Sequence, residues 1–157
     1  MFPKFDSMQK QSPIHFFYEC RPFSFRHRGH KKNFITQIFK KEGLSVVSLT
    51  YVFCSDKTLL QMNKQYLKHN YYTDILTFPF SGSGEPVSGE IYISIDRIKE
   101  NARNLGVSFQ EELNRVIFHG ALHLCGYKDK NMAEKAKMRE KENEYIQKLY
   151  TFLKTAR

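Results

Sequence analysis

A chain of 157 residues, 41% of them hydrophobic, can bury one core, and this composition excludes an intrinsically disordered segment. The formal net charge of +9 favours a polyanionic partner, most commonly RNA or DNA, although an inert basic surface has the same charge. The three cysteines are odd in number and widely spaced, which argues against a disulfide framework, and the lack of a Cys-x-x-Cys pair excludes an all-cysteine zinc site.

We expect a single domain over residues 1–157, because this length is typical of one domain and no linker or repeat interrupts the chain. The first residues lack the apolar stretch of a signal peptide, and no hydrophobic run approaches the length of a membrane span. These features predict a cytoplasmic protein that does not contact a membrane.

The first half of the chain alternates predicted strands and helices. Residues 14–18 alternate as a half-buried strand does, and the basic segment 21–32 follows. Apolar residues at helical spacing over 34–39 predict a helix that ends at Gly43. Residues 44–53 predict a strand, and Ser55 is placed to cap a helix that runs to about residue 67. The side chains expected to face inward are Val47, Leu49, Tyr51 and Phe53 in the strand and Leu59, Met62 and Tyr66 in the helix.

The second half begins with two short predicted strands, at 75–80 and 91–95, which a loop rich in Gly and Ser separates. A helix over 96–105 stops at Gly106, and Ser108 with Glu111 forms a capping box for a helix that ends at Gly126. A final helix from about residue 131 turns Met138, Tyr145, Leu149 and Phe152 inward. The mixture of elements predicts an α/β (α+β) fold with a small mixed sheet of about four strands covered by about five helices.

The residues most typical of a reactive site lie at the end of the capped helix and just after it. His119 and His123 are four residues apart, so both imidazoles project from the same helical face, beside the apolar side. Gly126 lets the chain leave the helix, and Asp129 is placed to turn back toward the pair. Two imidazoles and one carboxylate form a known catalytic zinc set that leaves a fourth position for water.

Two other interpretations of this motif stay open. The histidines alone are compatible with ordinary hydrogen bonding, without a metal. Zinc proteases of the His-Glu-x-x-His type carry their general base directly after the first histidine, where this chain has Gly120, so peptidase activity becomes a weak alternative. Cys125 points away from the histidines on the helical wheel, and we interpret it as a packing residue.

Four segments together resemble the YbeY family of bacterial endoribonucleases, the rRNA maturation factors. They follow one another in the order of the family's own motifs, from about residue 44 to 130. In chain order they are Asn63-x-x-Tyr66, Thr73-Asp74-Ile75-Leu76-Thr77-Phe78-Pro79, Gly89-Glu90-Ile91 and His119-Gly120-x-Leu122-His123-Leu124-x-Gly126-Tyr127.

The resemblance implies a metal-dependent endoribonuclease directed at single-stranded RNA. It implies a role in ribosomal RNA maturation, at the 3′ end of 16S rRNA, and in quality control of the small ribosomal subunit. It also implies one zinc ion per chain and a mostly parallel sheet. The chain departs from the family in two places: Asp129 stands where the third ligand is usually a histidine, and Leu67 stands where an arginine is usual. A carboxylate can replace an imidazole on zinc, whereas Leu67 cannot grip a phosphate.

Further residues are candidates for catalysis and for RNA binding. Glu90 and Asp74 are the acids that we expect to act as a general base or to support the ligands, although a structural role is the alternative for each. A bound metal would acidify a water molecule and neutralise charge on a phosphate oxygen. Phe23 and Phe25 lie among the basic residues and are either stacking platforms for bases or core residues. The residues expected to bind RNA are Lys68, Arg21, Arg26, Arg28, Lys31 and Lys32.

Two alternative functions remain beside the endoribonuclease. One is a zinc metalloprotease-like hydrolase, which Gly120 disfavours. The other is a ribosome-assembly factor without catalytic activity, in which the metal is structural.

Overall fold

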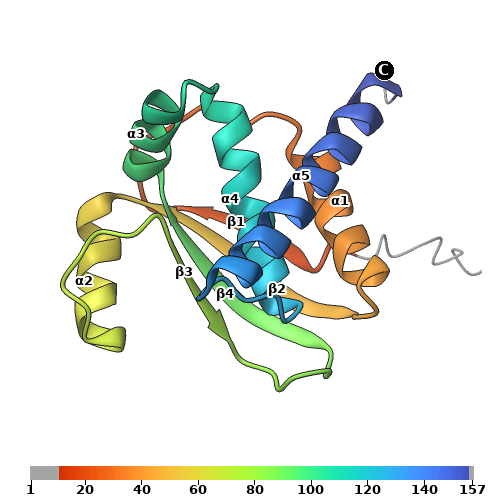
Figure 1. Ribbon diagram of the computed structural model, residues 1–157, viewed down its shortest axis with the longest axis horizontal. Helices are drawn as coiled ribbons and strands as arrows, with labels where there is room; N and C mark the ends of the chain where they lie inside the picture. The colour runs from red at the N-terminus through yellow and green to blue at the C-terminus, as the bar shows by residue number, and fades with distance from the viewer. Residues whose placement is uncertain (1–10, 156–157) are drawn as a thin grey trace, which may run out of the picture.

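The computed structural model describes residues 11–155, in which strands and helices alternate along the chain (Figure 1). None of the helices within this part of the chain combines the length and the apolar character that a membrane span requires. The elements are β1 (Ile14–Tyr18), α1 (Arg28–Lys41), β2 (Val46–Cys54), α2 (Asp56–Leu67), β3 (Ile75–Pro79), β4 (Val87–Ser94), α3 (Ile95–Leu105), α4 (Phe109–Leu124) and α5 (Met132–Thr155).

The four strands form one mixed sheet in the order β1-β2-β4-β3. β1 pairs with β2 and β2 with β4 in parallel, and β3 is an antiparallel edge strand beside β4. The predicted α/β class with a small, mostly parallel sheet is therefore confirmed. The antiparallel pair arises because only the short loop 80–86 connects β3 to β4, which leaves no room for a crossover helix.

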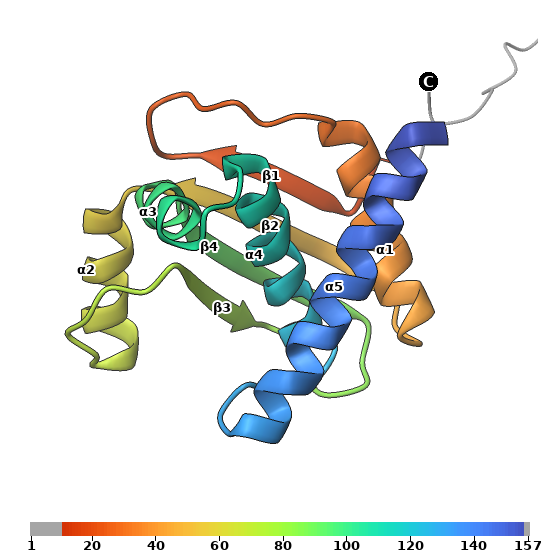
Figure 2. The same ribbon diagram turned by 45° about the horizontal axis from the view of Figure 1, so that its top comes forward.

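The main core lies between the sheet and a layer formed by α1, α3, α4 and α5, which lie on one side of the sheet in Figure 2. Alternate residues of the central strands point into this core, among them Tyr51 in β2 and Ile91 in β4. A smaller cluster on the other face of the sheet joins Leu59 of α2 to Cys54 and Leu76. α4 is the central helix, because α1, α3, α5 and β3 all contact it.

Glycine lets α4 approach the sheet closely. A Cβ atom at Gly120 would lie 2.9 Å from the Cδ1 atoms of both Ile75 and Ile91. Any side chain at this position would therefore push the helix away from β3 and β4. The residue that would be the general base in a His-Glu-x-x-His protease has no space here.

The predicted helix boundaries follow the predicted capping residues. The Oγ atoms of Ser55 and Ser108 accept hydrogen bonds from the backbone at 3.2 and 3.1 Å and begin α2 and α4. Gly43, Gly106 and Gly126 all adopt positive φ angles, as residues that end helices commonly do.

Three side chains that were predicted to face inward are exposed instead. Val47 is 65% exposed because the register of β2 shifts between Val46 and Ser48, which reverses the alternation at that point. Tyr66 is exposed because α2 covers only a small cluster and leaves its last turn over solvent. Phe152 is exposed near the end of α5, where its ring centroid lies 5.5 Å from that of His30.

Candidate metal centre and cleft

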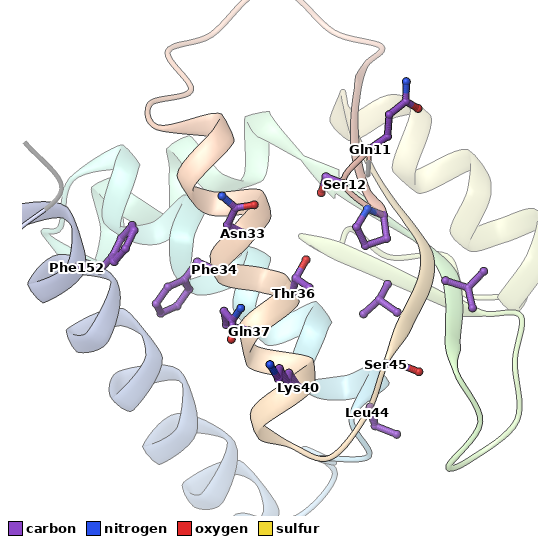
Figure 3. Close-up of a pocket in the computed structure, with 13 residues that line it drawn as sticks. Gln11, Ser12, Asn33, Phe34, Thr36, Gln37, Lys40, Leu44, Ser45 and Phe152 are labelled. Atoms are coloured by element: carbon purple, nitrogen blue, oxygen red, sulfur yellow. The ribbon is translucent and has the colours of Figure 1, made fainter. Parts of the chain in front are cut away.

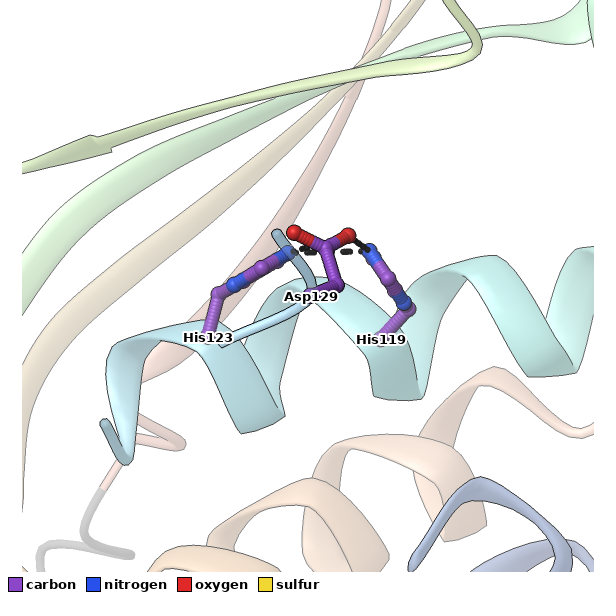
Figure 4. Close-up of side chains that lie close together, drawn as sticks. All are labelled: His119, His123 and Asp129. Carbon is purple, nitrogen blue, oxygen red and sulfur yellow. Dashed lines mark hydrogen bonds and ion pairs between the residues drawn. The ribbon is translucent and has the colours of Figure 1, made fainter. Parts of the chain in front are cut away.

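Three predicted ligands meet at the C-terminal end of α4 (Figure 4). The Nε2 atoms of His119 and His123 are 2.9 Å apart, and Oδ2 of Asp129 lies 3.3 Å from each of them. The chain reverses direction at Gly126, whose φ angle is 102°, and this turn carries Asp129 back over the helix. Within residues 11–155 this is the one cluster of three or more His, Cys, Asp or Glu side chains suited to a metal ion.

The spacing of the three donor atoms fits one tetrahedral cation. Ligands at the usual zinc distances of about 2.0–2.2 Å are separated by about 3.4 Å along each edge of a tetrahedron. The three separations in the structure, from 2.9 to 3.3 Å, come within about half an ångström of that value.

The outer hydrogen bonds of the two imidazoles assign their tautomers. The Nδ1 atom of His123 lies 2.9 Å from the carbonyl oxygen of Tyr127, which can only accept, so Nδ1 carries the proton. The Nδ1 atom of His119 lies 2.7 Å from a carboxylate oxygen of Glu142 and donates to it in the same way. In the neutral imidazoles both Nε2 lone pairs therefore face each other and Asp129, which is an arrangement of donor atoms that suits a cation between them.

Glu142 holds His119 from α5 and was missed by the sequence analysis. Its carboxylate is 5% exposed and also lies 3.1 Å from Arg115. Burial raises the pKa of Glu142, but the hydrogen bond and charge of His119, together with Arg115 and Arg139, outweigh burial and leave the pKa lower than usual. For His119 burial lowers the pKa, but the hydrogen bond and charge of Glu142, together with the charges of Asp129 and Asp74, outweigh burial and raise the pKa. A carboxylate in this position increases the basicity of a ligating imidazole.

The sequence contains a signal for Glu142. The residue lies four positions after Met138 and three before Tyr145, both of which were predicted to face the core and are buried. An acid on the inward face of a helix is uncommon unless it has a partner. The pairing with His119 explains its position.

A second network fixes the segment that carries Asp129. The hydroxyl groups of Tyr127 and Tyr145 donate to the two carboxylate oxygens of Glu42 at 2.9 and 2.6 Å, and Nζ of Lys141 lies 3.6 Å away. Burial raises the pKa of Glu42, but the three partners lower it by more than burial raises it, so the net pKa lies below its usual value. Because the carbonyl of Tyr127 also holds His123, this network ties α1 and α5 to the ligands.

A cleft of about 1040 Å³ opens on the three ligands. Its walls come from the end of α2 and the following loop, from β3, from the loop 81–85, and from the segment after α4. Lys130, Asp74 and Tyr71 are among the residues that line it. A larger cavity of about 1180 Å³ lies between α1 and the start of β2 and contains none of the three ligands (Figure 3).

The two acids predicted for catalysis lie in different places. Asp74 lines the cleft, and its pKa is raised by burial, although the charge of His119 opposes the shift. Glu90 does not reach the triad, because it alternates with Ile91 along β4 and so lies on the opposite face of the sheet from α4. There it accepts a hydrogen bond of 2.6 Å from Tyr92 and lines no part of the cleft.

The predicted RNA-binding residues lie in two separate regions of the molecule. Lys68 is exposed at the end of α2, beside the cleft wall. The segment 21–32 lies at the other end of α4, because Gln110 donates a hydrogen bond of 2.6 Å to the carbonyl of Ser24. Gln110 and His119 are about 14 Å apart along the helix axis. Of the predicted residues in this segment, Arg21, Arg26 and Arg28 are exposed and Lys32 is partly exposed.

Lys31 is a correction to the predicted RNA-binding set. α1 begins at Arg28 rather than near residue 34, so Lys31 lies one turn before Ile35 and faces the core. Its side chain is 1% exposed, and Nζ lies 4.6 Å from the centre of the Phe25 ring. Phe25 is itself buried and belongs to the core, and the partly buried ring of Phe23 packs against Phe53 at the edge of that core.

Comparison with known proteins gives consistent matches over most of the chain. Residues 23–150 match the family model described as Endoribonuclease YbeY. A protein of Cytophaga hutchinsonii named Endoribonuclease YbeY is 47% identical over 134 residues, which are 85% of this chain and 94% of that protein. A protein of Flavobacterium psychrophilum with the same name is 44% identical over 85% of this chain and 94% of its own.

A solved structure supports the fold. The solution structure of a Thermotoga maritima protein is 31% identical to this chain, with a TM-score of 0.63. The match covers 91% of this chain and 93% of the other.

Proposed function

Because the chain belongs to the YbeY endoribonuclease family, we propose that it is a metal-dependent endoribonuclease that cuts single-stranded RNA. The observation that carries the metal dependence is the set of three facing donor atoms at the mouth of the cleft. Zinc is the ion that we assign to the site, one per chain, because two imidazoles, one carboxylate and an open fourth position are typical of catalytic zinc. When bound, such an ion supplies an electrophile for a phosphate oxygen and acidifies water.

The residues of the chain have separate roles in this proposal. His119, His123 and Asp129 hold the ion, and Glu142 orients the first imidazole. Asp74 accepts or donates a proton in the cleft, since a carboxylate with a raised pKa suits that task. Lys130 lines the cleft and attracts the phosphate backbone of the substrate.

We further propose that the substrate is ribosomal RNA, cut during maturation of the 16S rRNA 3′ end and in quality control of the small ribosomal subunit. The names of the relatives and the net charge of +9 support an RNA substrate. The exposed residues Lys68, Arg21, Arg26 and Arg28 and the partly exposed Lys32 would contact RNA outside the cleft.

Two other functions receive less support from the geometry. A peptidase of the His-Glu-x-x-His type needs an acid at position 120, and Gly120 packs directly against β3 and β4. A purely structural zinc site has four protein ligands, whereas the described residues place three around the candidate centre. An open position toward the cleft favours catalysis.

The test compares RNA cleavage by the wild type with that by a His119→Ala, His123→Ala double variant. We expect the double variant to lose cleavage, and added zinc should not restore it. His15→Ala, which removes a histidine of β1 outside the cleft and outside the basic segment, is the matched control and should cleave as the wild type does. Equal cleavage by the wild type and the double variant would instead indicate a contaminating nuclease and contradict the proposal.

A further inference from the structure

The loop between α2 and β3 forms an aromatic wall of the cleft. Tyr71 lines the same cleft as His119 and His123, and its side chain remains 56% exposed. The ring of His69 stacks on that of Tyr71, with centroids 5.1 Å apart and planes inclined by 22°. The hydroxyl of Tyr71 lies 2.8 Å from Nδ1 of His69, which holds the two rings as one unit.

The backbone beneath these rings is fixed by a buried asparagine. Asn63 is 1% exposed, and its Nδ2 donates a hydrogen bond of 2.9 Å to the carbonyl of Tyr71. The backbone carbonyl of Asn63 accepts hydrogen bonds from the backbone N–H groups of Lys68 and His69. The aromatic pair is therefore set in place before any ligand binds, which reduces the entropic cost of binding.

An aromatic surface of this kind suits an unpaired nucleobase. Bases of single-stranded nucleic acid stack on tyrosine and histidine rings, and such stacking is tolerant of sequence because every base has a π-face. Bases inside a duplex are already stacked on their neighbours and cannot use the surface. The neighbouring side chain of Leu67 carries no charge and also lines the cleft, so this wall offers stacking rather than ion pairing.

We propose that Tyr71, backed by His69, is the platform on which an unpaired base of the RNA substrate stacks beside the candidate metal centre. This inference rests on the proposed RNA cleavage and adds the subsite that selects single strands. The adjacent Tyr72 provides a natural contrast. It is equally exposed, at 55%, but it does not line the cleft and lies instead against the guanidinium of Arg97 at 5.0 Å.

The chain contains no tryptophan, so one substitution creates a unique fluorescent reporter. We expect the fluorescence of a Tyr71→Trp variant to be quenched when a single-stranded RNA is mixed with it in a stopped-flow instrument, before turnover. A Tyr72→Trp variant is the matched control and should show no quenching. Quenching of both variants, or of neither while the RNA binds, would overturn the platform.

Affinity provides the second measurement. Loss of one base stack should weaken binding of a single-stranded oligonucleotide by about 5- to 100-fold in Tyr71→Ala, whereas Tyr72→Ala should bind as the wild type does. Tyr71→Phe keeps the ring and loses only the hydroxyl contact with His69, so it should lose less affinity than Tyr71→Ala. An abasic nucleotide at the stacked position should weaken binding to the wild type but not to Tyr71→Ala. Equal affinities of Tyr71→Ala and Tyr72→Ala would remove the platform while leaving RNA cleavage intact. Absence of RNA binding by the wild type would instead contradict the proposed function itself.

Discussion

Lys31 offers a sharp test of the assignment of charged residues to core and surface. Its ammonium group lies over the Phe25 ring at 4.6 Å, and within residues 11–155 no carboxylate forms a salt bridge with it. Burial, with a further contribution from Arg26, lowers the pKa of Lys31 from 10.5 to about 8. At about 1.4 kcal/mol for each pKa unit, the charged form destabilises the fold by about 3 kcal/mol at pH 7.

Lys31→Met keeps the apolar length of the side chain and removes the charge. We expect the free energy of unfolding at pH 7 to rise by up to about 3 kcal/mol. Between pH 8 and 10.5 the folded wild type binds fewer protons than the unfolded chain, so its stability rises with pH. The advantage of the variant should therefore shrink across this window and be small above it.

The assay is urea denaturation of the wild type and Lys31→Met at pH 7, 9 and 10.5. All other titratable groups are the same in the two proteins, so their contributions cancel in the difference. A variant that is less stable than the wild type at pH 7, or a difference that does not change with pH, would refute the burial argument.

RNA affinity should be unchanged in Lys31→Met. In Arg28→Met, which removes an exposed charge, the slope of log affinity on log salt should fall by about 0.7 if that residue contacts a phosphate.

Three further predictions concern the support of the candidate centre. Glu142→Gln should lower zinc affinity by about 10- to 100-fold, measured by competition with a chromophoric chelator, because His119 loses its charged partner; an unchanged affinity would contradict that role. In Glu42→Gln one of the two tyrosine hydroxyl groups faces the amide NH2 group and loses its acceptor, so the free energy of unfolding in urea should fall by about 1–3 kcal/mol. Full wild-type stability would show that the network is dispensable. Gly120→Glu should lower the unfolding free energy by at least about 1–3 kcal/mol without peptidase activity, and a stable peptidase would disprove the packing argument.

The elements with regular patterns could be predicted from the sequence. The helix that carries His119 and His123 has a capping serine, an apolar arc and a terminal glycine, and all three signals agree with the structure. The same regularity places the two imidazoles on one face. Asp129 could be predicted as a third ligand because Gly126 reverses the chain.

Other features depend on contacts that no local pattern encodes. The exposure of Val47 follows from a register shift against β4, and the burial of Lys31 follows from an earlier start of α1. Glu142 meets His119 only because α5 packs against α4. Glu90 was a plausible catalytic acid from the sequence, but strand alternation turns its side chain to the face of the sheet opposite α4.

The central claim is that His119, His123 and Asp129 jointly hold one divalent cation. The most direct measurement is elemental analysis with zinc titration of the purified wild type, Asp129→Ala and Asp129→His. We predict about one zinc ion per chain in the wild type, a large loss of affinity in Asp129→Ala, and retention in Asp129→His, which supplies a third imidazole. Equal zinc content in the wild type and Asp129→Ala, or no zinc in either, would contradict the claim.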